Sequence, residues 1–473
     1  MSGSVTSGPG PSEEPSGPPP VARGDRWNAR VWALAGPIII SNLSTPLLGA
    51  VDTAVVGHLP DPAYLGGVAI GAIIFDFLFW GFGFLRMGTT GFTAQAHGAG
   101  TPDELRATLA RPLLLAAVLG AGLILLQAPI AVLAFLLIDA STMVEDLAQQ
   151  YYAIRIWSAP ATLANFAMIG WLLGMQRARA VLLLQVTLNS INIVLDLLFV
   201  VGFGWGIAGV AYASLIAEVT AALLGLAIIG RVLRISGGAW NRQRILDRAR
   251  LIALFRVNAD ILIRTLCIVA AFAYMTARGA EMGDVILAAN AVLLQLQYIA
   301  SYGLDGFAHA VEVLAGNALG ARSRRAFRQA VRVSTGWAIA LAGLMTGIYL
   351  VAGSSIIAVF TDIEAVREAA GTYLIWMIAA PLVSVWGFQL DGIFIGATRT
   401  GAMRNAMILS LLIYLAACWV LIPLLANHGL WLAFLILMAA RGLTLGAYYP
   451  GLERSVASSA GAVDDGGQRL GRL

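Results

Sequence analysis

Acidic side chains interrupt stretches of this chain that are otherwise apolar. Asp52 falls within "PLLGAVDTAVVGHL" (residues 46–59), and Asp196 falls within "NSINIVLDLLFV" (residues 189–200). An aspartate inside a membrane-spanning helix costs about 2.5–3.5 kcal/mol on insertion scales. A cost of that size indicates that the acids have a function or a buried partner, or that these stretches do not span a membrane.

The two acids are predicted to lie at a similar depth. Asp52 is expected about one and a half turns before the outer end of its helix, and Asp196 about two turns before the outer end of its own. Asn192 lies one turn before Asp196 on the same helix face. Ser214 lies about two turns into the following helix. The spacing therefore brings four oxygen-bearing side chains to one level.

Two carboxylates that face one another without a cation share a proton, because like charges disfavour two ionised groups in contact. Arg155 is the nearest basic candidate, and Arg86 is expected deeper. The acid pair is therefore a predicted proton-binding site. With added oxygens from Asn192 and Ser214 it could instead bind Na⁺, and the spacing does not choose between the two ions. A third alternative, in which the two acids never meet, also stays open.

The expected helix that carries Asp52 also contains Pro37 and Pro46. Proline removes a backbone hydrogen bond and kinks a helix. A helix that can bend and that carries an ionisable acid is a candidate coupling element. Prolines are also more frequent in membrane helices than in soluble ones, so a purely structural role stays open.

A second group of charges lies in the later half of the chain: Asp260, Arg264, Asp305 and Asp391. Asp260 and Arg264 are four residues apart on one expected helix, so they can pair with each other. Arg441 could neutralise an acid on a neighbouring helix. A structural role and a functional role remain open for each of these residues.

Composition predicts the elements that must position these side chains. The chain has 473 residues, of which 59% are hydrophobic and 12% charged, whereas soluble domains carry about 25% charged residues. We therefore expect an all-α integral membrane protein. A membrane-spanning helix needs roughly 20 apolar residues. About twelve such runs occur, near residues 31–57, 66–96, 108–138, 147–174, 180–203, 206–231, 252–278, 285–318, 329–352, 367–396, 404–425 and 429–450.

The arginines crowd alternate loops of this pattern, and the loops between them are neutral to acidic. This distribution is the positive-inside pattern, and it predicts that both termini lie in the cytoplasm. The expected location of this multi-pass protein is the cell's inner (plasma) membrane. The net charge of +4 is accounted for by these loops, so no nucleic-acid partner is expected.

Short matches recur at one offset along the chain. "LLGMQRAR" (172–179) resembles "FIGATRTG" (394–401), and "AHGA" (96–99) resembles "ALGA" (318–321), each at an offset of 222 residues. A duplicated six-helix unit is expected, with both halves crossing the membrane in the same sense. The predicted domains are a disordered cytoplasmic tail, an N-terminal lobe, a cytoplasmic linker, a C-terminal lobe and a second cytoplasmic tail, at residues 1–27, 28–234, 235–251, 252–451 and 452–473.

The chain has no glycine-rich nucleotide loop, and its four histidines are scattered without metal-ligand spacing. We therefore expect no enzyme activity, no cofactor and no metal site beyond Na⁺ at the acid pair. A membrane enzyme that acts on lipids would need clustered polar residues near one membrane face, and the arginines there instead resemble topology signals.

At this level of detail the sequence resembles the multidrug and toxic-compound extrusion (MATE) transporters, most closely their DinF-like branch. The stretches that carry the resemblance are "GPIIISNLSTPLLGAVDTAVVGHL" (36–59), "FWGFGFLRMGTTGFTAQAHGAG" (79–100), "NSINIVLDLLFV" (189–200), "ANAVLLQLQYIASYGLDGFAHAVEVLAGNALGA" (289–321) and "FQLDGIFIGATRTGAM" (388–403).

The resemblance implies two six-helix lobes around a V-shaped cavity and export of drugs driven by inward H⁺ or Na⁺. By motif, Asp52 matches the family's helix-1 aspartate, which binds the coupling cation, and Pro37 matches the proline associated with bending. Asn192 and Asp196 match the helix-5 Asn-x-x-x-Asp pair. Ser214 falls where related proteins often have a threonine.

In the second half, Asp391 matches the acid of a helix-10 "DG" motif that the NorM-like branch uses together with a helix-7 glutamate. The stretch "RVNADILIRTLCI" (256–268) offers Asp260 and Arg264 instead, with Ile268 near the expected glutamate. This difference favours proton coupling through the first lobe.

The resulting prediction is a monomeric H⁺-coupled antiporter that exports lipophilic, often cationic small molecules by alternating access. Its expected partners are a small-molecule drug or toxic metabolite and the lipid bilayer. The alternatives are a Na⁺-coupled exporter and a lipid-linked oligosaccharide flippase of the same superfamily. Acids outnumber arginines at membrane depth, which argues against a flippase that holds pyrophosphate.

Overall fold

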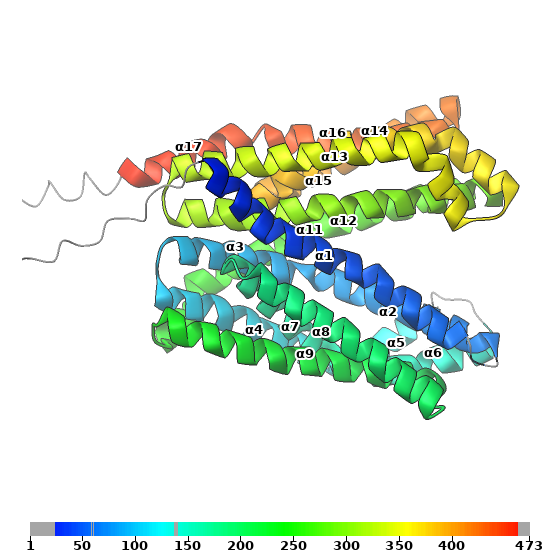
Figure 1. Ribbon diagram of the computed structural model, residues 1–473, viewed down its shortest axis with the longest axis horizontal. Coiled ribbons are helices and arrows are strands. Elements are labelled where there is room, and N and C mark those ends of the chain that lie inside the picture. Colours follow the sequence, from blue (N-terminus) through cyan, green and yellow to red (C-terminus); the bar gives the residue numbers. More distant parts are fainter. Residues whose placement is uncertain (1–23, 58, 60, 137–140, 462–473) are drawn as a thin grey trace, which may run out of the picture.

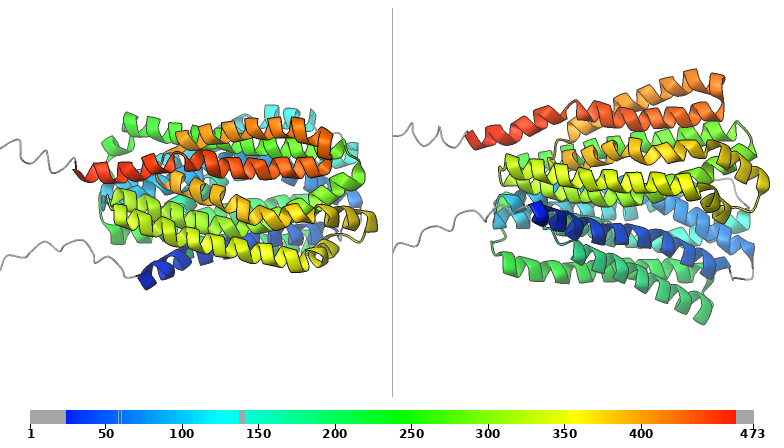
Figure 2. Two further views of the ribbon diagram at one scale, coloured as in Figure 1. Left: turned by 90° about the horizontal axis from the view of Figure 1, so that it is seen from above. Right: turned by 45° about the horizontal axis from the view of Figure 1, so that its top comes forward.

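The computed structural model describes residues 24–57, 59, 61–136 and 141–461, and this part of the chain is helical, without strands. Ten segments are long and apolar enough to cross a membrane. Two further helices, α1 (Gly24–Gly57, 34 residues) and α11 (Arg248–Ala280, 33 residues), run alongside these ten (Figures 1 and 2). The predicted all-α class is confirmed, and with α1 and α11 the described residues provide the twelve long helical segments that the prediction needs.

Short breaks divide several of the first six spans. These spans are formed by α1, α2 (Pro62–Trp80) with α3 (Phe84–Gly98), α4 (Pro102–Leu125) with α5 (Gln127–Leu136), α6 (Thr142–Arg155) with α7 (Ala159–Gly174), α8 (Ala178–Asp196) and α9 (Gly206–Ser236). The expected run at 108–138 thus begins six residues earlier, at Pro102, because Asp103 and Glu104 in the first helical turn suit the positive end of the helix dipole.

The remaining spans are mostly unbroken. They are α11, α12 (Asp284–Gly320), α13 (Arg324–Phe360), α14 (Glu364–Gly396), α15 (Thr400–Leu425) and α16 (Asn427–Gly446), preceded by the short α10 (Arg242–Ile245) and followed by α17 (Tyr449–Gly461). The beginning of α1 and the end of α17 lie at the same end of the bundle (Figure 1).

The helical part extends beyond both predicted lobe boundaries. The N-terminal tail was expected at 1–27, but α1 begins at Gly24, and residues 1–23 lie outside the described residues. The C-terminal tail was expected at 452–473, but α17 continues to Gly461, and residues 462–473 lie outside the described residues. Burial explains this second difference, since the Leu452 and Val456 side chains pack into the core.

A close helix crossing occurs at the same place in each half of the chain. A Cβ atom on Gly170 of α7 would lie 2.3 Å from the carbonyl oxygen of Arg86 on α3. A Cβ atom on Gly392 of α14 would lie 2.2 Å from the carbonyl oxygen of Ala308 on α12. Both members of the second pair follow the first by the 222-residue offset. The duplicated unit is thus visible in the packing, where only glycine admits such backbone contact.

The two lobes meet through contacts that are also related by this offset. A Cβ atom on Gly98 would lie 1.9 Å from the carbonyl oxygen of Asn317, and one on Gly320 would lie 1.9 Å from that of Gln95. Gly98 and Gln95 are the counterparts of Gly320 and Asn317. The contact is therefore reciprocal, as expected for two repeats related by a pseudo-two-fold axis along the membrane normal.

Candidate functional site

Asp52 of α1 and Asp196 of α8 meet in the N-terminal lobe. Their side chains hydrogen-bond to each other. Asp196 is 0% exposed, and no N–H group or hydroxyl group among the described residues donates a hydrogen bond to its Oδ1. Two carboxyl groups in contact favour a shared proton or a bound cation, because two negative charges repel each other. The alternative in which these acids lie apart does not describe this structure.

Asn192 and Ser214 extend the acid pair. In the amide orientation that satisfies both neighbours, Asn192 Nδ2 donates to Asp196 Oδ2 at 2.9 Å, and Asn192 Oδ1 accepts from the Ser214 hydroxyl at 3.0 Å. The two side chains are 2% and 7% exposed. The structure thus brings together all four side chains that the spacing placed at one depth. The carboxamide links α8 to α9 and orients the Asp196 carboxyl group.

Asp196 ends the regular part of its helix. The six residues Leu197–Gly202 continue as a π-helical turn. Such turns are rare, and they occur frequently at functional sites because the wider helix frees backbone groups and redirects side chains.

Tyr151 and Arg155 of α6 complete the network, and sequence reasoning did not assign a role to the tyrosine. Arg155 Nη1 donates to the Tyr151 hydroxyl, which also hydrogen-bonds to Ser214. Arg155 lies close enough to Asp52 and Asp196 to interact with both electrostatically. The four-residue spacing of Tyr151 and Arg155 on one helix face was a signal available in the sequence.

Arg155 is shared with further acids of the same lobe. It interacts electrostatically with Asp76 of α2 and Glu218 of α9. The Glu218 carboxylate accepts a hydrogen bond from Asn165 Nδ2 at 2.7 Å. One arginine thus faces several carboxyl groups, so it cannot neutralise all of them if every one is ionised.

Pro37 lies in the first half of α1, which runs without a break from Gly24 to Gly57. The neighbouring Ile39 packs against Gly306 of α12 in the other lobe, where a Cβ on the glycine would lie 2.3 Å from Ile39 Cγ1. The proline is therefore close to an interlobe contact. Bending of α1 at this position stays a prediction.

The acids of the C-terminal lobe have basic partners. Asp391 Oδ2 accepts hydrogen bonds from Arg264 Nη2 and, at 2.7 Å, from Arg441 Nη2. Asp260 pairs with Arg404 at 2.6 Å and accepts from the Thr400 hydroxyl at 3.0 Å. The expected pairing of Asp260 with Arg264 is wrong, because each residue instead pairs with an opposite charge on another helix.

Asp305 lies among charges between the lobes. It interacts electrostatically with His309, Arg86, Arg264 and Arg441. Arg86 of α3 contacts the His309 ring, with 3.0 Å between Nη1 and Nε2, and His309 Nδ1 lies 2.9 Å from Glu312 Oε2. The group of second-lobe candidates is therefore a cation-rich network rather than an open cation site.

Comparison with known structures shows which fold this is. The fold superposes with a TM-score of 0.83 on an outward-facing multidrug resistance MATE-family transporter of the MOP superfamily, at 18% identity, over 91% of this chain and 97% of that one. The fold is thus that of a two-lobed MATE-type membrane transporter.

Sequence comparison gives the family. The MatE family model matches residues 37–198 and 261–420, and the chain belongs to this family. It is 44% identical to DNA damage-inducible protein F of Escherichia coli (strain K12), over 89% of this chain and 91% of that protein. It is 26% identical to a probable multidrug resistance protein NorM of Rhizobium meliloti (strain 1021), over 91% and 94% of the two chains. The predicted family is confirmed.

Proposed function

We propose that this MATE-family transporter exports lipophilic, often cationic small molecules in exchange for protons that enter the cell. The contact between the Asp52 and Asp196 carboxyl groups supports the proposal most directly. A pair that must share a proton or hold a cation can take up and release one positive charge. The names of the NorM relatives, which are called probable multidrug resistance proteins, support a drug as the exported molecule.

The proposed cycle is alternating access. With the site open inward, the acid pair is unprotonated and the lobes hold the drug. With the site open outward, a proton from outside binds between Asp52 and Asp196, α1 bends near Pro37, and the drug loses its site. The return to the inward-open state releases the proton and restores the charged pair.

Two observations favour a proton over Na⁺ as the coupling ion. A hydrogen bond between the Asp52 and Asp196 carboxyl groups needs a shared proton, whereas Na⁺ would have to lie between oxygens that are already in contact. In the second lobe, Asp391 already carries two arginine partners. A Na⁺ site there would have to displace buried guanidinium groups, which is unfavourable. A Na⁺-coupled cycle at Asp52, Asn192 and Asp196 remains the second candidate.

We also propose an inner-membrane location with both termini in the cytoplasm. The arginines support this orientation, because they cluster in or beside the connections α3–α4, α7–α8, α9–α11, α12–α13 and α14–α15, on the side of the bundle where α1 begins. A reporter that works only in the cytoplasm should be active when it is fused to the C-terminus. A reporter that works only outside the cytoplasm should be inactive at the same position.

Dye efflux from proteoliposomes tests the function. A fluorescent cationic dye should leave vesicles under an imposed pH gradient with wild-type protein. It should stay with Asp52→Asn, which keeps the size of the side chain but cannot ionise. Asp146→Asn, at an exposed position on α6, is the matched control and should transport normally.

The other outcomes distinguish the alternatives. Efflux that follows only a Na⁺ gradient and is lost in Asp52→Asn would replace the proton by Na⁺. Efflux that persists in Asp52→Asn with its pH dependence intact would contradict the coupling role of the pair. If no dye moves under either gradient while a lipid-linked oligosaccharide does, the flippase alternative would be correct.

A further inference from the structure

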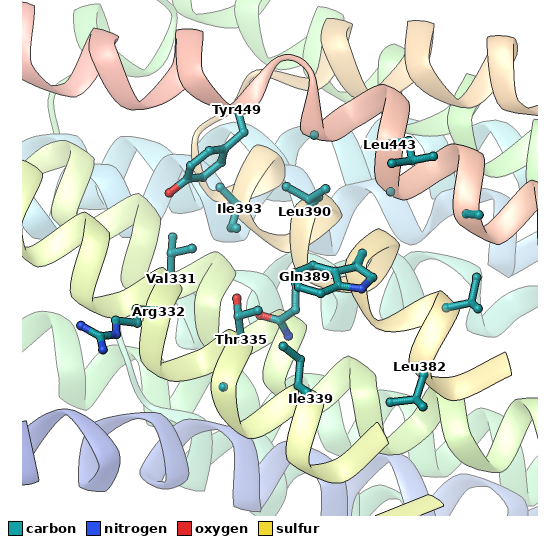
Figure 3. Close-up of a pocket in the computed structure, with 16 residues that line it drawn as sticks. Val331, Arg332, Thr335, Ile339, Leu382, Gln389, Leu390, Ile393, Leu443 and Tyr449 are labelled. Atoms are coloured by element: carbon teal, nitrogen blue, oxygen red, sulfur yellow. The ribbon is translucent and has the colours of Figure 1, made fainter. Parts of the chain in front are cut away.

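A groove of about 810 Å³ lies on the second lobe, away from the acid network. Residues of α13, α14 and α16 form its walls, and Tyr449 of α17 lies at one end (Figure 3). Its volume is within the range of about 300–1,000 Å³ that is typical of ligand sites. No step of the proposed transport cycle uses it.

The groove faces the hydrocarbon part of the membrane. Leu443 is 76% exposed, Trp386 50% and Leu382 42%. All three belong to segments long and apolar enough to span a bilayer. Exposed apolar side chains at such positions contact lipid tails, so any molecule that fills the groove comes from the bilayer.

One polar side chain in the groove has no partner. Gln389 is 2% exposed, and both its amide nitrogen and its amide oxygen lack hydrogen-bond partners in the described part of the chain. Figure 3 shows its side chain directed into the groove beside Thr335. A buried amide without partners is destabilising, and a ligand with acceptor and donor atoms would remove that penalty.

An arginine lies on α13 one helical turn before Thr335, the residue beside the Gln389 amide. Arg324 and Arg328 both pair with Glu453. Arg332 lines the groove, is exposed and has no carboxylate partner among the residues that the structure describes. Thr335 and Ile339 follow at intervals of about one turn toward the membrane centre. The groove is therefore cationic at one end, polar next and apolar beyond.

This order of chemistries matches a phospholipid from headgroup to tail. We propose that the groove binds one anionic phospholipid of the leaflet nearest the start of α13. Its phosphate contacts Arg332, an ester carbonyl accepts from Gln389 or Thr335, and its acyl chains cover Ile339, Leu382 and Leu443. Arginine-containing pockets between membrane helices recognise anionic headgroups in this way.

Lipid retention measured by native mass spectrometry tests the site. Delipidated full-length protein is incubated with phosphatidylglycerol or with phosphatidylcholine of the same chain length. Wild type should retain one phosphatidylglycerol at least about tenfold more tightly than phosphatidylcholine, as one charge-assisted contact gives. Arg332→Gln should remove this preference. Arg231→Gln, at an exposed arginine near the end of α9 in the other lobe, should keep it.

A second pair of variants compares a leucine inside the groove with a leucine outside it on the same helix. Gly336 lines the groove, and a Cβ there would meet nothing within 4 Å. Gly336→Leu should abolish retention of the lipid while raising helix propensity. Gly343→Leu on the same helix is the matched control, because it also meets nothing within 4 Å but lies outside the groove.

Three results would overturn the proposal. Equal retention of the two lipids would show that the groove does not read headgroup charge. Unchanged retention in Gly336→Leu would place the lipid elsewhere. A dimer of wild-type protein that Gly336→Leu dissociates would identify a second copy of the chain as the occupant. Dye efflux is independent of all three, so the site and the transport cycle can fail separately.

Discussion

Each lobe brings the same three repeat positions into contact, but the side chains at these positions differ between the lobes. In the first lobe these positions hold Asp52, Asn192 and Asp196. In the second lobe, at the same 222-residue offset, they hold Tyr274, Tyr414 and Cys418. The second set is also in contact, since the rings of the two tyrosines lie 6.1 Å apart and Tyr414 hydrogen-bonds to Cys418. The duplicated lobes thus bring the three positions together in both halves, but only the first-lobe set contains carboxyl groups.

The acids of the second lobe lie elsewhere and have a different environment. Asp391 forms ion pairs with two arginines, whereas the Asp52 and Asp196 carboxyl groups hydrogen-bond to each other. A carboxylate between two guanidinium groups stays ionised and fixes neighbouring helices. A carboxyl pair has two accessible charge states. Depth in the membrane therefore does not by itself identify a residue that can change its charge state. The residues that contact the carboxyl group determine whether it can do so.

The largest effect is expected from equivalent substitutions in the two lobes. Asp196→Asn should reduce ion-driven dye efflux to background, because the proposed proton site loses one of its two carboxyl groups. Cys418→Ser, at the equivalent position, should leave efflux near the wild-type rate. Both variants are measured in proteoliposomes at equal protein density. An equal loss of efflux in the two variants would show that the two lobes do not differ in function at these positions.

A smaller functional effect but a large loss of stability is expected from Asp391→Asn. The change leaves Arg264 and Arg441 without their carboxylate, and removing one partner of a buried ion pair costs about 3–5 kcal/mol. Thermal unfolding in detergent should show a lower midpoint.

The pH-gradient dependence of the remaining efflux in Asp391→Asn should match that of wild type. A changed ion dependence with unchanged stability would instead make Asp391 a coupling residue and remove the distinction between the lobes.

The smallest effect is expected where the lobes contact each other reciprocally. A methyl group at Gly98 or at Gly320 would force the facing backbone away, so each alanine substitution should weaken this end of the interface and slow efflux several-fold. Since the contacts are equivalent, the two variants should be slowed alike. Gly230→Ala, where a Cβ meets nothing within 4 Å, is the control. A large difference between Gly98→Ala and Gly320→Ala would show that the interface is not symmetric in function.

Much of the fold was predictable because hydropathy and length act locally. Runs of apolar residues identified the membrane helices, and the 222-residue offset indicated the duplicated unit before any contact was known. The depth of Asp52, Asn192, Asp196 and Ser214 followed from residues per turn, and the structure places all four in contact. Boundaries were less predictable, as α17 shows, because Leu452 and Val456 are helical through packing against distant residues.

The sequence by itself determined the membrane class, the duplicated lobes and the set of charged residues at depth, since these depend on composition, periodicity and spacing along one helix. The tertiary structure alone decided which charges meet. Asp260 and Arg264 had ideal spacing to pair, yet Asp260 pairs with Arg404 and Arg264 with Asp391. Helix rotation and crossing determine such contacts, and both depend on how whole faces pack, which no single spacing records.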